Sequence, residues 1–181
     1  EVLLDDQDYA AVYGLDYFDT ARYLHQRHKL TEPVESLARR QEICAIRRID
    51  LELEPAPGAV EFIRALGARG IPLGLASNSP SAYVRRVLQR LGIDHLIPFP
   101  ISRDDVTDGK PHPAPYLEAC LRLDAPPAAC LAVEDSAVGM ESALAAGLSV
   151  ALVGPHAPEP ASQRVFHSVD IIQLAARFFP V

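Results

Sequence analysis

Two adjacent acids, Glu134 and Asp135, follow the apolar run 130–133 (CLAV) and precede Ser136. The run is typical of a buried strand, and serine is a common residue at the start of a helix. Carboxylates side by side at the end of a buried strand repel each other, and a hard cation such as Mg²⁺ relieves that repulsion. The same acids also suit a helix N-terminus, where the helix dipole favours negative charge. The local pattern leaves metal binding and helix capping both open.

A second polar group, Ser77, Asn78 and Ser79, follows the apolar run 71–76 and precedes Pro80. Hydroxyl groups and free backbone N–H groups at a helix N-terminus form a binding site for anions such as phosphate. A simpler interpretation makes Ser79 the N-cap residue, with Pro80 at the first helical position. Both interpretations predict a helix directly after this polar group.

Lys110 lies in the loop 108–113 (DGKPHP), between these two polar groups in the chain. Pro111 and Pro113 stiffen the backbone around it, and a lysine ammonium offers a compact positive charge to a phosphate. A lysine in a surface turn is the alternative. Lys29 and Lys110 are the only lysines among 17 basic residues, so a lysine retained in a loop draws attention.

Strands and helices alternate from residue 55 onward. The expected strands are 71–76, 99–102, 130–133, 148–153 and 168–172, and the expected helices are 59–66, 81–91, 113–123, 136–146 and 174–179. Continuous apolar strands separated by helices are typical of a parallel sheet covered on both faces. We therefore predict a doubly wound, Rossmann-like α/β core whose chemistry lies at the carboxyl ends of the strands.

Residues 1–54 carry no strand signal, and apolar residues recur there at helical spacing. We expect helices over 16–30 and 34–53, packed antiparallel, with Thr31 as the N-cap of the second and Pro33 in its first turn. The segment 55–58 (PAPG) then breaks the pattern. The sequence thus divides into a helical part, 1–54, and an α/β core, 55–181.

Composition excludes several classes of protein. Acidic residues outnumber basic ones by 24 to 17, for a net charge of −7, which argues against nucleic-acid binding. No apolar run approaches the roughly 18 residues of a membrane-spanning helix, so we expect no membrane partner. The odd number of cysteines and the lack of a signal peptide indicate a reducing cytoplasm. We expect a monomer.

In their order along the chain, these polar groups resemble the haloacid dehalogenase-like superfamily, in its capped phosphatase and β-phosphoglucomutase branch. LGLASNSP (73–80) resembles the second motif of the family, and DGKPHPAPYLEA (108–119) resembles the third. CLAVEDSAVGMESALAAGL (130–148) is similar to the fourth, and EPAPGAVEFIRALGARGIPLGLAS (54–77) to the passage from cap to core. The resemblance covers essentially the whole chain, with residues 14–54 as the second half of a small α-helical cap.

The first motif of the family, an apolar strand followed by DxDG(T/V), has no counterpart in this sequence. Asp6 and Asp8 form a superficial DxD, but the apolar run before them is short and no glycine follows. They also lie too near Ser77 in the chain to leave room for a whole cap. The resemblance therefore implies that the first strand, with its nucleophilic aspartate, and the first cap helix precede these residues in the full-length protein.

The resemblance implies a Mg²⁺-dependent phosphatase of a small phosphomonoester, such as a sugar phosphate, working through an aspartyl-phosphate. Ser77, Asn78 and Lys110 would bind the phosphoryl group, with Ser77 and Lys110 taking part in catalysis. Asp135 and Glu134 would hold Mg²⁺.

Several alternatives remain at this point. A phosphomutase shares all these parts, although the segment 14–19 (GLDYFD) lacks the arginine expected there in a β-phosphoglucomutase. A chain without the nucleophile would be an inactive fragment or a pseudoenzyme. A receiver-type domain also has acids and a lysine at strand ends, but would carry its acids earlier. In the cap, Tyr17, Phe18, Arg22 and His25 are candidates for substrate contact or, alternatively, for ordinary helix surface.

Overall fold

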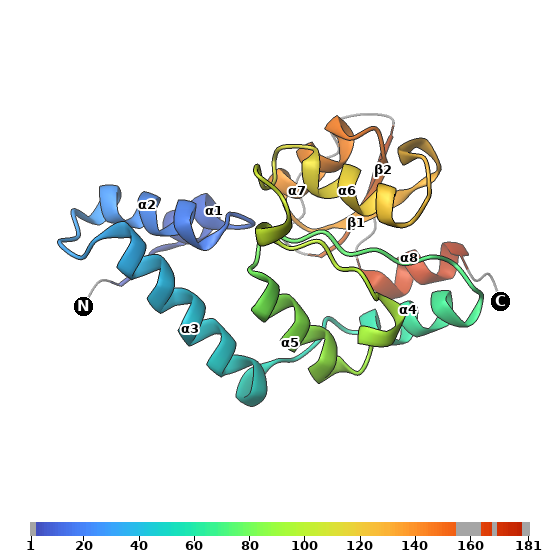
Figure 1. Cartoon of the computed structure of the whole chain (residues 1–181), viewed down its shortest axis with the longest axis horizontal. Helices are drawn as coiled ribbons and strands as arrows, with labels where there is room; N and C mark the ends of the chain where they lie inside the picture. The colour runs from blue at the N-terminus through green and yellow to red at the C-terminus, as the bar shows by residue number, and fades with distance from the viewer. Residues whose placement is uncertain (1–2, 155–163, 168–169, 179–181) are drawn as a thin grey trace.

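The computed structural model describes residues 3–154, 164–167 and 170–178. Helices α1 (Asp6–Val12), α2 (Tyr17–His28) and α3 (Val34–Glu52) lie together at one end of the molecule (Figure 1). The elements from α4 onward form the larger part at the other end. None of the described helices has both the length and the apolar character that crossing a membrane requires.

The sheet contains three parallel strands in the order β1 (Leu131–Glu134), β2 (Ser149–Leu152) and β3 (Val165–His167). Leu131 lies opposite Ser149 and Glu134 opposite Leu152, so β1 and β2 end at the same edge. The expected strands at 130–133 and 148–153 are confirmed to within one residue at each end. Parallel pairing, inferred from their continuous apolar character, is confirmed as well.

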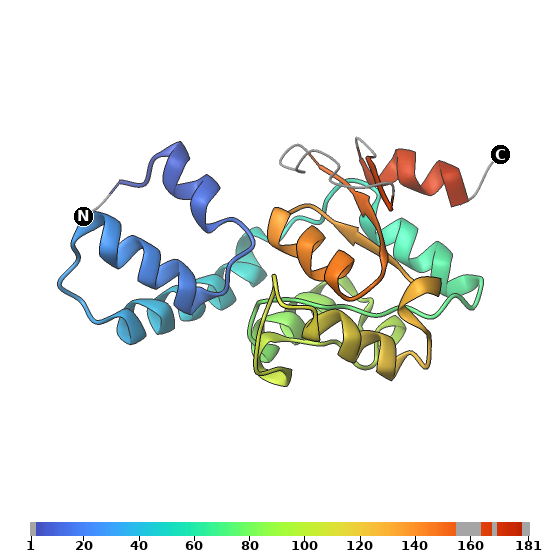
Figure 2. The same cartoon turned by 90° about the horizontal axis from the view of Figure 1, so that it is seen from above.

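Helices cover both faces of this sheet, as a doubly wound fold requires (Figures 1 and 2). Val150 and Leu152 of β2 pack with residues of α6 (Ala114–Arg122) and α7 (Ala137–Ala145). Ala151 and Val153 point the other way, toward α4 (Ala59–Ala68) and α8 (Ile171–Phe178). Because both faces are buried, the consecutive residues from Val150 to Val153 are all apolar. The predicted α/β class is thus confirmed.

Three predicted strands differ from the structure. Residues 71–76 and 99–102 run parallel but share a single bridge, Ala76 to Ile101, with Ile101 N–H donating to Leu75 O (2.8 Å) and Ser77 N–H to Ile101 O (2.9 Å). Among the described residues β1 pairs only with β2, so neither segment joins the sheet. The predicted strand 168–172 was wrong, since β3 precedes it and α8 already begins at Ile171; residues 168–169 lie outside the described part.

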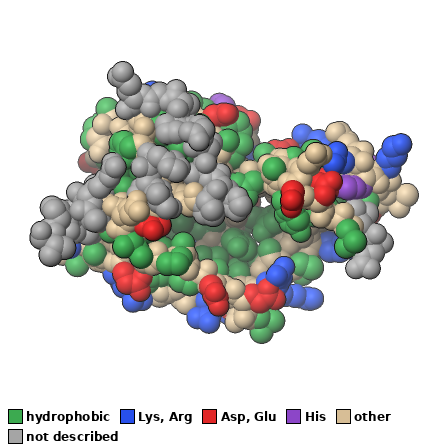
Figure 3. Space-filling model, turned by 180° about the vertical axis from the view of Figure 1, so that it is seen from behind, with side chains coloured by type: hydrophobic (Ala, Val, Ile, Leu, Met, Phe, Trp, Pro, Cys, Tyr) green, Lys and Arg blue, Asp and Glu red, His purple; other side chains and the backbone are tan. Residues whose placement is uncertain are grey.

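Helix α5 (Ser81–Leu91) and three short 3₁₀ turns complete the larger part. The turns are η1 (Asp94–Leu96), η2 (Arg103–Asp105) and η3 (Pro127–Ala129). Val84 and Leu88 of α5 pack with Val60 of α4 in a second apolar cluster. Seen from behind, the surface has a central hollow with many hydrophobic side chains around it (Figure 3).

Helices α2 and α3 pack together around Ala21, Leu37 and Ala38, as the helical spacing predicted. Asp16 is the N-cap of α2 and accepts from the backbone N–H of Asp19 (2.8 Å). The prediction for the start of α3 was wrong: Pro33 is its N-cap, without a side-chain hydrogen bond, and Thr31 lies before it. Proline suits this position because it has no N–H group to satisfy.

Asp8 is a buried carboxylate between α1 and α2. It accepts from Arg27 Nε (2.7 Å) and lies 2.9 Å from His28 Nε2. Burial raises its pKa, but hydrogen bonds from the Asp5 backbone, His28 and Arg27 outweigh that effect and lower the pKa below its usual value. These partners account for a charge that would otherwise be costly to bury.

Candidate functional site

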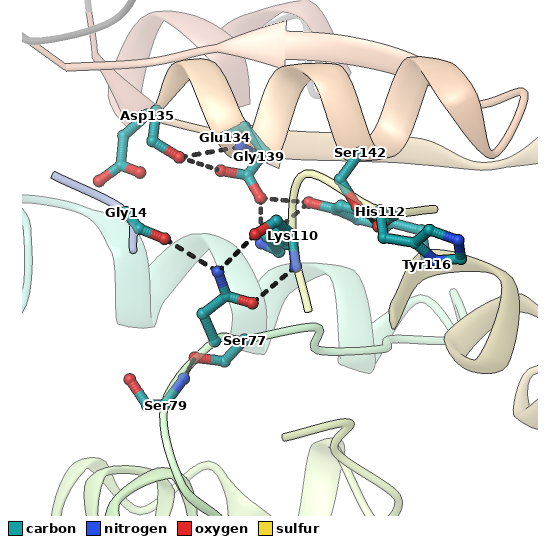
Figure 4. A network of polar contacts seen from close by, with 12 residues as sticks. Gly14, Ser77, Ser79, Lys110, His112, Tyr116, Glu134, Asp135, Gly139 and Ser142 are labelled. Atoms are coloured by element: carbon teal, nitrogen blue, oxygen red, sulfur yellow. Dashed lines mark hydrogen bonds and ion pairs between the residues drawn. The ribbon is translucent and has the colours of Figure 1, made fainter. Parts of the chain in front are cut away.

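The side chain of Asn78 joins three segments that are far apart in the chain (Figure 4). Its Nδ2 donates to the carbonyl oxygens of Gly14 (3.0 Å) and Lys110 (3.0 Å), and its Oδ1 accepts from Lys110 N–H (2.7 Å). All of its polar atoms are therefore occupied by backbone groups, and the residue is only 8% exposed. The side chain holds the Lys110 loop in place. The phosphate contact expected of Asn78 would therefore be made by its backbone N–H group.

Lys110 and Glu134 form an ion pair inside the molecule. The Lys110 ammonium contacts Glu134 Oε1, and their side chains are 9% and 7% exposed. Tyr116 of α6 donates its hydroxyl to the same oxygen, and Lys110 Nζ lies 4.9 Å from the centre of the Tyr116 ring. Burial and the negative charge of Glu134 raise the pKa of Tyr116 well above its usual value, so this hydroxyl remains a donor.

The other oxygen of Glu134 lies against the start of α7. Ser136 Oγ donates to Glu134 Oε2 (3.3 Å) and accepts from Gly139 N–H (3.2 Å), which makes Ser136 the N-cap of α7. A Cβ atom at Gly139 would overlap the Glu134 carboxylate, so only glycine fits there. The capping interpretation of the two acids is thus wrong in detail, because the cap is Ser136.

Asp135 points away from this buried group and is exposed. Its Oδ2 accepts a hydrogen bond from the hydroxyl of Tyr13 (2.8 Å), which lies between α1 and α2. Burial and the negative charge of Asp135 raise the pKa of Tyr13 to about 12. Tyr13 therefore acts as a donor at neutral pH.

Ser77 occupies the turn between residues 71–76 and α5. Its Oγ accepts from Ser79 N–H (3.0 Å), and its own N–H is bound to Ile101 O. The simpler interpretation of this turn was wrong, because Pro80, not Ser79, is the N-cap residue of α5. Ser81 N–H is instead satisfied by Asp104 Oδ2 (2.8 Å).

The donor chemistry at Asp135 suits Mg²⁺, which typically takes one or two carboxylates and completes its shell with water and phosphate oxygens. No group of three or more His, Cys, Asp or Glu side chains within the described ranges could hold a metal. Asp135 and its neighbour Glu134 both lie at the carboxyl end of β1. Glu134 already contacts Lys110 and Tyr116, so Asp135 is the more accessible candidate ligand.

A groove of about 680 Å³ lies between the helical end and the core. Tyr17 and Phe18 line it, as do Arg39 and Arg103. Arg22 and His25, predicted with them, are not among the described residues that line it. Arg22 instead pairs with Asp19 (3.1 Å) and lies 5.0 Å from the Phe18 ring centre.

Sequence reasoning missed Tyr13, Tyr116 and the role of the Asn78 side chain. Tyr116 falls within the segment 108–119 that resembles the third motif, so that segment was the available signal. Tyr13 is 122 residues from its partner Asp135, and no local pattern connects them.

The haloacid dehalogenase-like hydrolase profile matches residues 2–147 of this chain. The chain belongs to the haloacid dehalogenase-like hydrolase family. It is 38% identical over 103 residues to the bifunctional riboflavin kinase/FMN phosphatase of Arabidopsis thaliana, covering 56% of this chain and 27% of that protein. It is also 38% identical over 91 residues to the phosphoglycolate phosphatase of Escherichia coli K12, covering 50% and 36%.

The fold of this haloacid dehalogenase-like chain also matches solved structures. CbbY from Rhodobacter sphaeroides, in complex with xylulose-(1,5)bisphosphate, is similar with a TM-score of 0.79 at 21% identity. That match covers 92% of this chain and 79% of CbbY. The matches to the curated relatives named above span well under half of those proteins' own lengths.

Proposed function

We propose that the protein containing this chain is a Mg²⁺-dependent phosphatase of a small phosphomonoester. The observation that carries the proposal is the Lys110–Glu134 ion pair beside exposed Asp135, with Asn78 joining the Lys110 loop to the Ser77 turn. A positive charge, a hydroxyl group and a metal-binding carboxylate are the groups that phosphoryl transfer needs at one place. Relatives that are phosphatases by name support the same conclusion.

Each residue has a distinct role in this proposal. Ser77 Oγ and the backbone N–H of Asn78 bind phosphoryl oxygens near the N-terminus of α5, where the helix dipole favours an anion. Lys110 neutralises charge on the phosphoryl group and on the nucleophile. Asp135, with Glu134 beside it, holds the metal, which when bound screens the two anions as they meet.

The nucleophile in this proposal is the aspartate of the family's first motif, on a strand that would precede these residues in the full-length protein. Its carboxylate oxygen attacks phosphorus while the bond to the alcohol oxygen breaks, and water then hydrolyses the aspartyl-phosphate. Within the described part of the chain, Glu134 is the only carboxylate that contacts Lys110. Asp8 cannot take the nucleophile's place, because Arg27 and His28 hold it between α1 and α2.

Two features support a further strand between β1 and residues 71–76, which would carry that aspartate. Val133 of β1 is 40% exposed, although it lies in a continuous apolar run. Among the described residues β1 also pairs only with β2, so its other edge lies beside no strand of the sheet. A strand there would pair backbone groups that are otherwise costly to leave unpaired.

We also assign residues 1–54 as part of a cap and residues 55–181 as the core. Segment 13–16 of this cap contacts the core loops through Tyr13, Gly14 and Asp16. In this position it excludes water from the site and contributes to substrate selection through the groove that Tyr17 and Phe18 line.

The test is a phosphatase assay of the full-length protein on p-nitrophenyl phosphate and a panel of phosphometabolites, with Mg²⁺ or with a chelator. We expect Mg²⁺-dependent release of phosphate. The polypeptide of residues 1–181 is assayed in parallel and should be inactive. Transfer of phosphate between positions of a sugar phosphate, without release, would instead identify a phosphomutase. Turnover by residues 1–181 alone would contradict the assignment of the nucleophile.

A further inference from the structure

Residues 13–16 contact the core at three places: Asp135, Asn78 and Arg103 of η2. The Tyr13 hydroxyl donates to Asp135 (2.8 Å), Gly14 O accepts from Asn78 (3.0 Å), and Asp16 Oδ2 accepts from Arg103 Nε (2.9 Å). Of these contacts, only that of Tyr13 is with a proposed metal ligand. In the described part of the chain, the Tyr13 hydroxyl thus links the helical part to the proposed metal-binding carboxylate.

Gly14 determines how closely this segment approaches α7. Its φ of +82° favours glycine, and an added Cβ would lie 2.6 Å from Val138 Cγ2 and 3.0 Å from Ser136 Cβ. Because the Gly14 backbone lies directly against the start of α7, the adjacent Tyr13 ring brings its hydroxyl within reach of Asp135. The contact is therefore a consequence of the backbone fit as well as of the tyrosine side chain.

We propose that Tyr13 is a positioning residue, which orients the Asp135 carboxylate for metal binding when the helical part lies against the core. The inference rests on the proposed Mg²⁺ site. The hydroxyl binds Oδ2 and leaves Oδ1 without a protein hydrogen bond among the described contacts. Groups that hydrogen-bond to a metal ligand and orient it typically change metal affinity by about 10–100-fold.

The coupling must operate in both directions. If contact of segment 13–16 with the core strengthens metal binding, then bound metal strengthens that contact by the same factor. Metal would therefore reduce the opening motions of residues 13–16. A tyrosine that merely helps to attach the helices to the core would produce no such link.

Two variants separate these possibilities. Tyr13→Phe removes the hydroxyl that binds Asp135 and keeps the ring. The matched control, Asp16→Ser, removes the ion pair with Arg103 in the same segment, while serine still suits the N-cap of α2. Asp16 does not contact Asp135, so its loss weakens the attachment of the segment without affecting the carboxylate.

The measurements use the full-length protein. Mn²⁺ affinity is measured by electron paramagnetic resonance, and hydrogen exchange of residues 12–18 is followed with and without Mg²⁺. We expect Tyr13→Phe to weaken Mn²⁺ binding about tenfold and to abolish the Mg²⁺-dependent slowing of exchange. Asp16→Ser should speed exchange overall but keep the response to Mg²⁺. Its Mn²⁺ affinity should fall clearly less than that of Tyr13→Phe, because Tyr13 still orients Asp135 whenever the segment lies against the core. In an Asp135→Asn background, Tyr13→Phe should have no added effect on metal binding.

Unchanged Mn²⁺ affinity in Tyr13→Phe would overturn the inference, as would an equal loss in Asp16→Ser. Absence of Mn²⁺ binding to the wild-type protein would overturn it together with the proposed metal site. A protein that shows the expected metal effects, yet hydrolyses no phosphomonoester, would contradict the proposed function and leave the positioning role of Tyr13 supported.

Discussion

Lys110 and Tyr116 both contact Oε1 of Glu134, so the lysine charge and the tyrosine hydroxyl share one buried carboxylate oxygen. The Lys110 ammonium also lies near the Tyr116 ring, which favours a cation at that position. The ion pair holds the ammonium at the carboxyl end of β1, where we propose that it meets the phosphoryl group. The ammonium donates to Glu134 and lies within hydrogen-bonding distance of the Tyr116 hydroxyl, which leaves a third N–H group for a substrate.

Lys110→Arg should lower turnover of the full-length enzyme at least tenfold, equivalent to about 1.4 kcal/mol of transition-state stabilisation. The reason is steric and geometric: a planar guanidinium does not fit where a compact ammonium contacts both Glu134 and Tyr116. Lys29→Arg is the control, because Lys29 is at the C-terminus of α2. Steady-state kinetics check the result, and near wild-type turnover would place Lys110 outside the site.

Asp135→Asn should raise the Mg²⁺ concentration that gives half-maximal activity, while the free energy of unfolding changes little. The exposed position of Asp135 explains the small effect on folding, and the lost negative charge explains the weaker metal binding. Asp6→Asn in α1 is the control for the removal of an acid elsewhere. Mg²⁺ titration of activity measures the metal requirement, and urea unfolding measures the free energy of unfolding. An unaltered Mg²⁺ requirement would argue against metal ligation by Asp135.

Gly139→Ala should destabilise the fold by about 1–3 kcal/mol, as overpacking of a well-packed interior typically does. The new methyl group would overlap the Glu134 carboxylate, which Lys110 and Tyr116 hold in place. Gly67→Ala in α4 is the matched control, since the neighbouring atom there is the end of the flexible Leu96 side chain. Thermal unfolding of both variants provides the comparison, and equal stability in the two would contradict the expectation.

Tyr116→Phe should cost about 1.5–3 kcal/mol at neutral pH, the range for a hydrogen bond to a charged group. Above pH 10 the difference in the free energy of unfolding between Tyr116→Phe and the wild type should become smaller. The pKa of folded Tyr116 is raised well above 10, so the unfolded chain loses the phenol proton first and wild-type stability falls as pH rises. Urea unfolding midpoints at neutral and alkaline pH measure this difference in stability. Tyr9→Phe is the control, because Tyr9 is 60% exposed. A stability difference between wild type and Tyr116→Phe that grows with pH would contradict the expected direction.

Local sequence patterns predicted helices α2 to α7, strands β1 and β2, and the order of the polar loops. The helical spacing in α2, α3 and α5 follows from apolar faces that each helix must bury, and the continuous apolar runs predicted β1 and β2. Because parallel strands end at one edge, the residues after those strands were expected to lie close together. Glu134 and Asp135 could therefore be proposed from the chain alone, and Lys110 from the resemblance of its loop to the third motif of the family.

The tertiary structure decided which atoms meet. Asn78 and Lys110 are 32 residues apart, and Tyr13 and Asp135 are 122 apart, so no periodicity relates them. Their contacts depend on how the helices pack and on where a glycine allows two backbones to approach. The same holds for residues 71–76, whose apolar run predicts a strand although only one bridge forms. A strand needs a hydrogen-bonding partner beside it, and that partner is a property of the assembled sheet.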